Sequence, residues 1–277
     1  MSMTQSSIII IGAFILWLVM FALSVTAAAG DRRVTVGGAP SLAPLAEQFS
    51  AQFRKNHPET EIEIRRANSN YAVNGVRTGA IQIGLVTRNL HPTEKLGLKI
   101  ATLGHDPIII LSYPWNPVAN LSLEQLRQIY LGKITSWKTV GGEDQGIVVL
   151  TREASASLHK IFLEALFGKR LDGHEKAFVL RANKEKVLRT IKRVRGSLGY
   201  GIVRPEEALA EGVTVMALDG KSPSAANLRQ AVYPLVRPQF VVAKAKTDGI
   251  VREWMSGFEE FAKRQFQQGN RNAEPAS

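Results

Sequence analysis

Hydrophobic and polar positions follow two periods along the first third of the chain, one typical of strands and one of helices. Apolar side chains occupy every second position in Arg33–Gly37 and Glu61–Arg65, which predicts two strands. Between them, Leu and Phe side chains recur at helical spacing and predict a helix that stops at Pro58. A short helix that ends at Gly79 and a mostly apolar strand at Ile81–Val86 follow. This order predicts βαβ units in a largely parallel sheet.

The rest of the chain continues the alternation. The apolar run Ile108–Leu111 predicts a buried central strand at which the chain passes into a second lobe. A capping box at Ser122–Gln125 predicts a helix start, and Ile147–Leu150 predicts a strand that leads into a strongly amphipathic helix ending at Gly168. A final helix runs through Trp254. Three further strands are predicted before it: Gly199–Val203, Val213–Ala217 and Phe240–Val242.

The expected fold class is therefore α/β with two lobes, each a mixed, mostly parallel sheet flanked by helices. No long Gly/Ser linker separates the halves, so strands are expected to join the lobes. We assign residues 30–110 and 212–277 to lobe 1 and residues 111–211 to lobe 2.

Residues 1–29 have the composition of an export signal. Residues 8–25 are almost wholly apolar, and the small residues that follow suit a signal peptidase, with cleavage after Ala29. The segment before the apolar run carries no Lys or Arg, and the run is nearly long enough to span a bilayer, so an uncleaved anchor is the alternative. Either way, we expect the rest of the chain outside the cytoplasm, in the periplasm.

Composition narrows the class of protein. Hydrophobic residues make up 45% of the 277 residues and charged residues 21%, which is ordinary for a globular protein and excludes a disordered one. The chain has no cysteine, which excludes disulfides, thiolate metal sites, cysteine nucleophiles and a lipidated cysteine anchor. Any chemistry must therefore come from other side chains.

The formal net charge is +11, and residues 1–29 carry no charged side chain, so the rest of the chain keeps all of it. The densest basic stretch, Lys176–Arg195, contains eight Lys or Arg against one acid, Glu185. It is either a solvated helix face or a positive field that concentrates anions or docks on an acidic surface. Export argues against nucleic acid as the partner.

Catalytic motifs are missing from the sequence. The chain lacks the zinc spacing His-Glu-x-x-His, the nucleophile motif Gly-x-Ser-x-Gly and the phosphate-binding loop Gly-x-x-x-x-Gly-Lys-Ser/Thr. Its five histidines are scattered: His57, His91, His105, His159 and His174. We therefore expect a protein that is not an enzyme and needs no metal and no cofactor.

One recurring element does suggest binding: a strand that runs into a short polar turn, which then opens a helix. It occurs around Ser41, around Ser69 and around Ser155–Ser157. Helix N-termini present free backbone N–H groups and a partial positive charge, and such turns gather at the carboxyl ends of strands. Arg152, directly after a buried strand, would add a bidentate charged contact. The sequence thus predicts an oxyanion site between the lobes, unless these serines are only helix caps.

The order of motifs along the chain resembles that of a known family. Asn116–Trp137 is the most specific match, and three other segments support it: Gln82–Arg88, Gly196–Gly201 and Tyr233–Pro238. From about residue 34 to residue 261, the chain resembles the phosphate-binding proteins of ABC transporters, within the type II periplasmic-binding-protein fold. The resemblance implies a protein whose two lobes close around inorganic phosphate or a similar oxyanion, with the ligand cleft between them. It also implies an inner-membrane ABC permease as partner, and we expect a monomer.

The resemblance carries ligand-contact positions over to this chain: Ser41, Ser69, Thr87, Arg88, Arg152, Ser155 and Ser157. Pro40 stands where a Ser or Thr would donate a hydroxyl and a backbone N–H, and Ala156 and Leu158 replace a Ser and a Thr of the third loop. Thr87 occupies a position that is Asp in some members, where that Asp accepts the proton of hydrogen phosphate. We expect weaker binding, since each lost donor to a buried anion costs roughly 1.5–3 kcal/mol.

Other functions stay open at this point. A degenerate receptor would keep the two-lobed frame and use it to contact a sensor or another envelope protein. A binder of a different ligand would take another oxyanion or a small acidic organic molecule. An exported hydrolase is the weakest alternative, because no nucleophile motif supports it.

Overall fold

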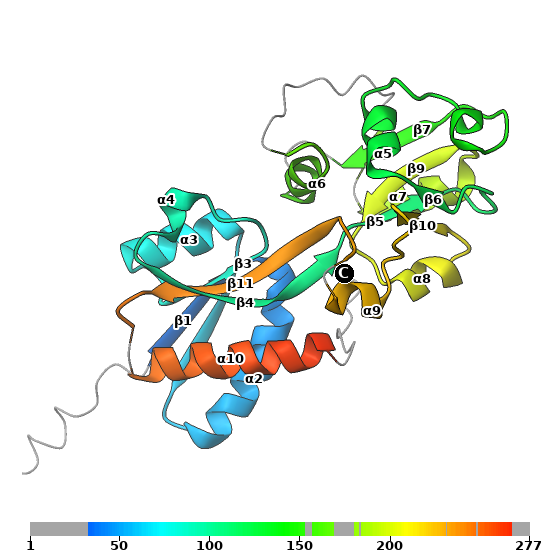
Figure 1. Cartoon of the computed structure of the whole chain (residues 1–277). Coiled ribbons are helices and arrows are strands. Elements are labelled where there is room, and N and C mark those ends of the chain that lie inside the picture. The colour runs from blue at the N-terminus through cyan, green and yellow to red at the C-terminus, as the bar shows by residue number, and fades with distance from the viewer. Residues whose placement is uncertain are drawn as a thin grey trace, which may run out of the picture.

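The structure is a computed structural model that describes residues 33–152, 157–168, 180–182, 184–230, 232–247 and 249–267. Residues 1–29, the predicted export signal, lie outside this range. The described chain forms two lobes, each built around one mixed sheet, and the lobes lie side by side in Figure 1. The predicted two-lobed α/β architecture is confirmed.

The described strands of the first lobe form a five-stranded sheet with the order β2-β1-β3-β11-β4. β1 pairs in parallel with β2 and β3, whereas β11 pairs antiparallel with β3 and β4. The inner strands are apolar on both faces because helices cover both sides of the sheet. The strands are β1 (Arg33–Gly38), β2 (Glu61–Arg66), β3 (Ile83–Val86), β4 (Leu98–Pro107) and β11 (Val236–Lys244).

Helices pack on both faces of this first sheet (Figure 1). α2 (Ala43–Asn56) and α10 (Gly249–Gln267) share one hydrophobic core with the sheet, in which aromatic rings of the two helices contact each other. α3 (Ser69–Thr78) buries its apolar side chains against the opposite face, and the short α4 (Pro92–Lys95) follows on that side. α2 and α3, which follow the turns at Ser41 and at Asn68, therefore pack on opposite faces of the sheet.

The described strands of the second lobe form a six-stranded sheet with the order β6-β10-β5-β9-β7-β8. β5 pairs antiparallel with β10 and β9, and β7 pairs in parallel with β9 and β8. The strands are β5 (Ile109–Ser112), β6 (Asn120–Leu121), β7 (Val148–Arg152), β8 (Leu180–Ala182), β9 (Ser197–Gly201) and β10 (Thr214–Leu218).

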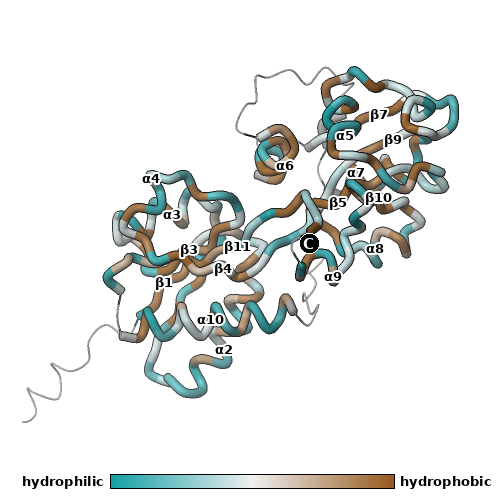
Figure 2. Tube along the Cα trace, viewed as in Figure 1, coloured by the Kyte–Doolittle hydropathy of each residue, from teal (hydrophilic) through white to brown (hydrophobic). Residues whose placement is uncertain are grey.

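Described helices pack on both faces of the second sheet. α5 (Leu123–Tyr130) and α6 (Ser157–Phe167) share one core, and α7 (Lys184–Arg193) and α8 (Pro205–Ala210) share the other. In Figure 2 the hydrophobic colour gathers in the strands of both sheets and in α6. α9 (Ala225–Arg229) precedes the return of the chain to the first lobe.

The three tryptophans of the described residues have different surroundings. Trp254 is buried in the first-lobe core, and Trp137, which begins the 3-10 turn η2 (Trp137–Val140), is buried in the second-lobe core, each with 0% exposure. Trp115 lies between β5 and β6, is 92% exposed and has a φ of +66°. The buried Asn116 holds that turn, because its Oδ1 accepts a hydrogen bond from the Val118 N–H (3.0 Å). Each lobe therefore encloses one indole in its core.

The chain crosses between the two sheets twice. The first crossing leads from β4 through Ile108 into β5, and the second leads from α9 into β11. The Ile108 N–H donates to the Leu235 carbonyl (2.9 Å), and the Tyr233 hydroxyl donates to the Ile108 carbonyl (3.2 Å). Two hydrogen-bonded segments therefore join the lobes.

The strand pairing differs from one predicted lobe boundary. Residues 212–277 were expected in lobe 1, but β10 pairs with β5 and β6 in the second sheet. The return to the first sheet comes only with β11. The apolar pattern of β10 predicts a strand without identifying its partner, because either sheet would bury it.

Most predicted elements are present, with ends shifted by a few residues. The capping box of α5 is confirmed, since the Gln125 N–H donates to the Ser122 hydroxyl (3.0 Å) and the Gln125 side chain accepts from the Ser122 N–H (2.8 Å). β4 was not predicted, although it is ten residues long. Polar and glycine positions near its end (Gly104, His105, Asp106) interrupt the alternation that identifies a strand.

Candidate functional site

The strand ends that precede the turns singled out by the sequence lie where the two lobes meet. β1 and β3 are parallel, so Ser41 and Thr87, which follow them, lie at one edge of the first sheet, and β11 begins at that edge. In the second sheet, Ile109 pairs with Gly201, so the carboxyl ends of β9 and of its parallel neighbour β7 lie beside the first crossing. Arg152, the last residue of β7, is therefore on the edge of the second sheet that faces the first lobe.

The turn that contains Ser41 is the 3-10 turn η1 (Pro40–Leu42) between β1 and α2. Gly38 allows this turn, because its φ is +140° and a Cβ there would lie 2.2 Å from the Leu85 carbonyl oxygen. The Ala39 N–H donates to the same carbonyl (2.9 Å). The half-buried Ser41 is thus held close to β3, and the proline before it donates no backbone N–H.

Arg237 is a cation at this turn that the sequence analysis did not single out. Its Nη2 donates to the Ser41 hydroxyl (3.4 Å) and to the buried Asp106 carboxylate (2.6 Å), which also accepts from Gln239. Among the residues that the structure describes, Arg237 Nε and Gln239 Oε1 are buried without a hydrogen-bond partner. Arg237 is separated from Asp106 by 131 positions and from Ser41 by 196, so only the motif Tyr233–Pro238 pointed to this segment.

Ser69 and Thr87 are brought into contact at the start of α3. Asn68 caps the helix, since its Oδ1 accepts from the Tyr71 N–H (2.9 Å). The Ser69 hydroxyl accepts from the backbone N–H of Thr87 (3.1 Å). Thr87 is 5% exposed, whereas Ser69 is half-buried. Two predicted ligand positions therefore lie side by side at one helix start.

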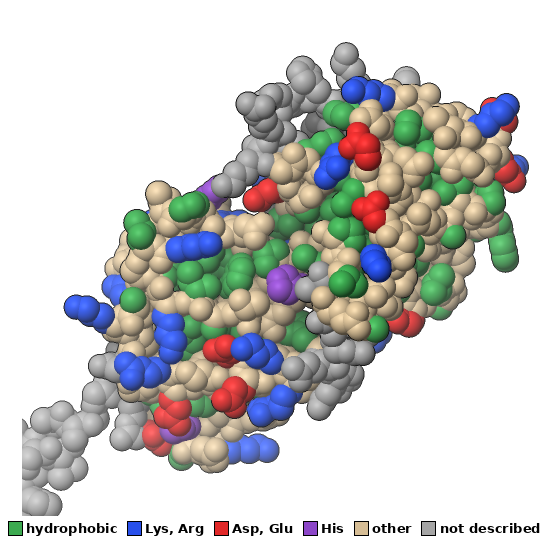
Figure 3. Space-filling model, in the orientation of Figure 1, with side chains coloured by type: hydrophobic (Ala, Val, Ile, Leu, Met, Phe, Trp, Pro, Cys, Tyr) green, Lys and Arg blue, Asp and Glu red, His purple; other side chains and the backbone are tan. Residues whose placement is uncertain are grey.

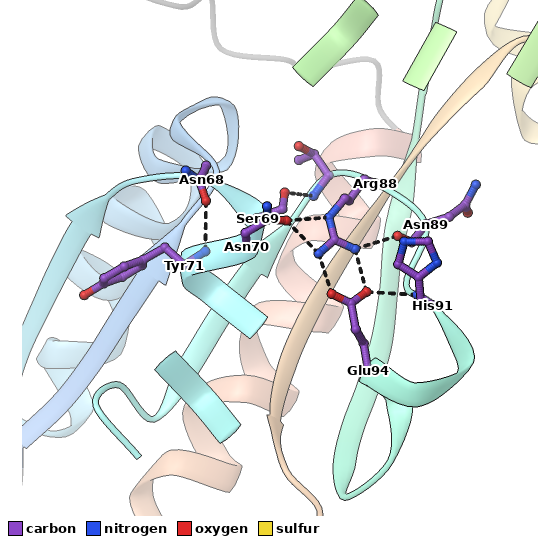
Figure 4. A network of polar contacts seen from close by, with 9 residues as sticks. Asn68, Ser69, Asn70, Tyr71, Arg88, Asn89, His91 and Glu94 are labelled. Carbon is purple, nitrogen blue, oxygen red and sulfur yellow. Dashed lines mark hydrogen bonds and ion pairs between the residues drawn. The ribbon is translucent and has the colours of Figure 1, made fainter. Parts of the chain in front are cut away.

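The guanidinium of Arg88 is engaged within the first lobe (Figure 4). It donates to both Glu94 carboxylate oxygens (2.7 Å each), to Asn70 Oδ1 (2.9 and 3.2 Å) and to the Asn89 carbonyl (2.8 Å), so all five of its N–H groups have an acceptor. Glu94 also accepts from the His91 N–H (2.9 Å). We call these five residues the Arg88 network. Direct contact of Arg88 with a ligand stays a prediction.

The charge of Arg88 changes the acidity of its partner. The hydrogen bonds from Arg88 hold the pKa of the Glu94 carboxyl at about 2, below its ordinary value of 4.5. Both side chains are 19% exposed, so the pair is shielded from water only in part. The Arg88 network thus ties the start of α3 to the turn before α4 by means of an ion pair.

The predicted positions of the second lobe are described in part. Arg152 ends β7, where its backbone pairs with Ala182 of β8, and Ser157 is the first residue of α6. Both backbones therefore occupy the strand end and the helix start that the sequence predicts. Ser155 and Ala156 lie outside the described residues. Ligand contact by Arg152, Ser155 and Ser157 stays a prediction.

A buried polar cluster lies beside this segment. His159 in the first turn of α6, Thr151 in β7 and Tyr200 in β9 are 7%, 1% and 1% exposed. His159 Nδ1 lies 3.1 Å from the Thr151 hydroxyl oxygen and 3.0 Å from that of Tyr200, and the two hydroxyl oxygens are 3.0 Å apart. We call these three residues the His159 cluster. No sequence motif pointed to this cluster, because His159 stands in no motif and its partners lie 8 and 41 positions away.

On the face that Figure 3 shows, both Lys or Arg and Asp or Glu side chains are present on each lobe. Ion pairs such as Arg66–Glu47 and Lys138–Asp144 join side chains of opposite charge. Within the described ranges, no group of three His, Asp or Glu is arranged to hold a metal ion. In the same part of the chain, no helix has the length and apolar character needed to cross a bilayer.

Comparison with known proteins extends over both lobes. Residues 24–263 match a family model described as PBP superfamily domain. The phosphate-binding protein PstS of Bacillus subtilis is 27% identical over 228 residues, which cover 80% of this chain and 73% of that protein. A crystal structure of an ABC-type phosphate transport receptor from Vibrio cholerae is similar, with a TM-score of 0.73, 26% identity, and coverage of 86% of this chain and 97% of that chain. A candidate substrate-binding protein of a phosphate ABC transporter from Clostridium perfringens, solved with bound phosphate, has a TM-score of 0.65, 25% identity, and coverage of 86% and 97%.

Proposed function

Because this chain belongs to the PBP superfamily domain family, we propose that it is a solute-binding protein that captures inorganic phosphate between its two lobes. The names of its relatives support phosphate as the ligand, since the Bacillus subtilis protein is a phosphate-binding protein and the Clostridium perfringens structure contains phosphate. A captured phosphate would contact both lobes at once and so hold them together.

The observation that carries the proposal is the pair of facing sheet edges. The turns at Ser41 and Ser69 lie on the edge of the first sheet, and the strand end at Arg152 lies on the edge of the second. A small oxyanion is bound by backbone N–H groups at helix starts and by a bidentate guanidinium, and we propose that the helix starts and Arg152 at these edges provide them. This arrangement supports Ser41, Ser69, Arg152 and Ser157 as ligand positions.

Arg237 adds positive charge on the first-lobe side. Its Nη2 lies 3.4 Å from the Ser41 hydroxyl oxygen, while Asp106 holds the guanidinium in place. We propose that Arg237 orients the Ser41 hydroxyl and partly offsets the backbone donor that Pro40 lacks.

Thr87 bears on the choice between anions. A carboxylate at this position would accept the proton of hydrogen phosphate, whereas a threonine hydroxyl can donate as well as accept. The site would therefore not require a proton on its ligand. We expect its preference for phosphate over sulfate to be small.

Export and delivery complete the proposal. The apolar segment within residues 1–29 would direct the chain out of the cytoplasm, to the periplasm. There it would pass its ligand to an inner-membrane ABC permease. We propose that the first lobe consists of residues 33–107 with 236–267, and the second of residues 109–218 with α9.

The test is anion binding by the purified chain without residues 1–29. Phosphate at a hundredfold excess over its Kd should raise the free energy of unfolding by about 2.7 kcal/mol, measured by thermal and urea denaturation. Arg152→Ala should abolish the shift. Arg193→Ala, which removes an exposed arginine of α7, is the matched control and should leave it intact.

Two results would overturn the proposal. One is a melting curve that phosphate, sulfate, arsenate and molybdate all leave unmoved. The other is a phosphate shift that persists in Arg152→Ala, which would place the site elsewhere.

A further inference from the structure

The His159 cluster has no role in the function proposed above. Thr151 directly precedes Arg152 in the sequence, and His159 lies two residues after Ser157. The side-chain contact between Thr151 and His159 therefore joins the described strand end at Arg152 to the helix start at Ser157. A strand end, a helix start and a neighbouring strand meet at this point.

The three polar atoms form a closed triangle. His159 Nδ1 lies within hydrogen-bond distance of both hydroxyls (3.1 Å to Thr151, 3.0 Å to Tyr200), and the hydroxyl oxygens lie 3.0 Å from each other. Hydrogen bonds fix direction as well as distance, so each group restricts the rotation of the other two. The triangle therefore fixes the start of α6 with respect to β7 and β9.

Aromatic rings of the described residues pack around Tyr200. The Tyr200 ring stacks on Phe162 of α6, with centroids 3.7 Å apart and planes 12° apart. Tyr130 of α5 packs against both rings, at 4.9 and 6.2 Å between centroids. Its hydroxyl donates to the Leu150 carbonyl in β7 (3.3 Å). These ring contacts therefore fix the Tyr200 side chain, and with it the position of the hydroxyl near His159.

Hydrophobic side chains would hold α6 on the sheet without polar atoms. Burying a histidine and two hydroxyls lowers stability unless they are paired, so the cluster is a costly way to achieve packing alone. Paired polar groups add a unique geometry. Apolar contacts tolerate small displacements of a helix along a sheet, whereas hydrogen bonds do not. The position beside Arg152 is where such precision matters for an oxyanion.

We propose that the His159 cluster is a positioning device that holds the end of β7 and the start of α6 in the relative placement that binds the anion. This inference rests on the proposed function, because that function assigns the end of β7 and the start of α6 to the anion site. His159 acts through the backbone of β7 and α6 and is a positioning residue, and Thr151 and Tyr200 are its partners.

The decisive variants separate the hydrogen bonds from the packing. His159→Leu removes the polar ring, whereas His159→Asn keeps a polar atom near the place of Nδ1. Tyr200→Phe keeps the ring stacked on Phe162 and removes only the hydroxyl. Leu163→Ala, which deletes apolar contacts from the same helix, is the control for lost stability without loss of the cluster.

Two readouts are measured well below each melting temperature. The first is phosphate affinity by calorimetry: His159→Leu and Tyr200→Phe should bind about tenfold more weakly, the effect of one lost hydrogen bond, with His159→Asn and Leu163→Ala within about twofold of the unmodified chain. The second is amide hydrogen exchange of the peptide of residues 149–162 without phosphate, which should speed up in His159→Leu and Tyr200→Phe only.

The outcomes are distinct. Equal affinity and equal exchange in all variants, or the same loss in Leu163→Ala, would overturn the positioning role and leave the proposed function intact. If the unmodified chain does not bind phosphate, the proposed function fails. In that case the exchange measurement still decides whether the cluster holds the end of β7 and the start of α6, and unchanged exchange in His159→Leu would overturn that as well.

Discussion

In the first lobe, the start of α3 is held by a charged network at the surface, whereas in the second lobe the start of α6 is held by three buried side chains. Arg88 and Glu94 are each 19% exposed, and the members of the His159 cluster are at most 7% exposed. Both groups support a helix start at the edge where the lobes meet. The same structural task is thus performed once by an ion pair and once by paired hydroxyls and an imidazole.

The difference predicts different sensitivities. A partly exposed ion pair is weakened by solvent screening and by protonation of its acid. Buried hydrogen bonds are insensitive to salt, but the loss of one partner leaves a polar atom in an apolar core. Substitution should therefore affect the second lobe more strongly, and solution conditions should affect the first.

The largest effect is expected from Thr151→Val combined with Tyr200→Phe. The pair of changes keeps the side-chain shapes and removes both hydroxyls from Nδ1 of the buried His159. The free energy of unfolding should fall by about 2–3 kcal/mol, measured by urea denaturation. Thr78→Val, which removes an exposed hydroxyl of α3, is the control and should cost less than about 0.5 kcal/mol. Equal small losses in both would contradict the comparison.

A smaller effect is expected from Glu94→Gln. The neutral amide cannot balance the guanidinium of Arg88, so the network loses its charge-assisted bonds. The free energy of unfolding at neutral pH should fall by about 1–2 kcal/mol, since the pair is only partly exposed. Glu260→Gln provides the control, because its pair with Arg264 is long (4.0 Å) and exposed, and it should change stability by less than about 0.5 kcal/mol. A Glu94→Gln loss no larger than the control would show that the network contributes nothing.

The smallest effect is the acid dependence of the same pair. The pKa of Glu94 is about 2 in the folded chain and 4.5 in its ordinary state, so its contribution is complete above 4.5 and is lost as the pH falls toward 2. At about pH 3, roughly half of the difference between the unmodified chain and Glu94→Gln should have disappeared. Denaturation curves of both proteins between pH 7 and about pH 2.5 measure it. A difference that stays constant over this range would rule out ionised Glu94 as its source.

The elements of the fold were largely predictable because each lobe buries both faces of its sheet. Helices with one apolar side and strands with apolar runs leave a clear period in the sequence, and the capping box at Ser122 even marks a boundary. The pairing of the strands was less predictable. The apolar pattern of β10 predicts a strand, but the residues around it do not indicate that it joins the second sheet. β4 was not predicted because Gly104, His105 and Asp106 near its end interrupt the apolar alternation that identifies a strand.

The candidate site was predictable only where it is local. Ser41 and Ser69 follow strands within a few residues, so their helix starts can be found by inspection of the sequence. Arg237 reaches Ser41 from 196 positions away, and Tyr200 reaches His159 from 41. The sequence likewise cannot show that the Arg88 guanidinium donates to Glu94, because the partner of this side chain depends on how α3 and α4 are placed. Contacts made across the fold carry no local period.

The burial of one indole in each lobe has a spectroscopic consequence. Without residues 1–29, the chain contains Trp115, Trp137 and Trp254, of which only Trp115 is exposed to solvent. Replacing Trp115 by phenylalanine would leave one fluorophore per core, so red-shifted emission on melting would come from the interior of each half. Removing either remaining tryptophan in turn would then reveal whether the halves of the molecule melt together or one after the other.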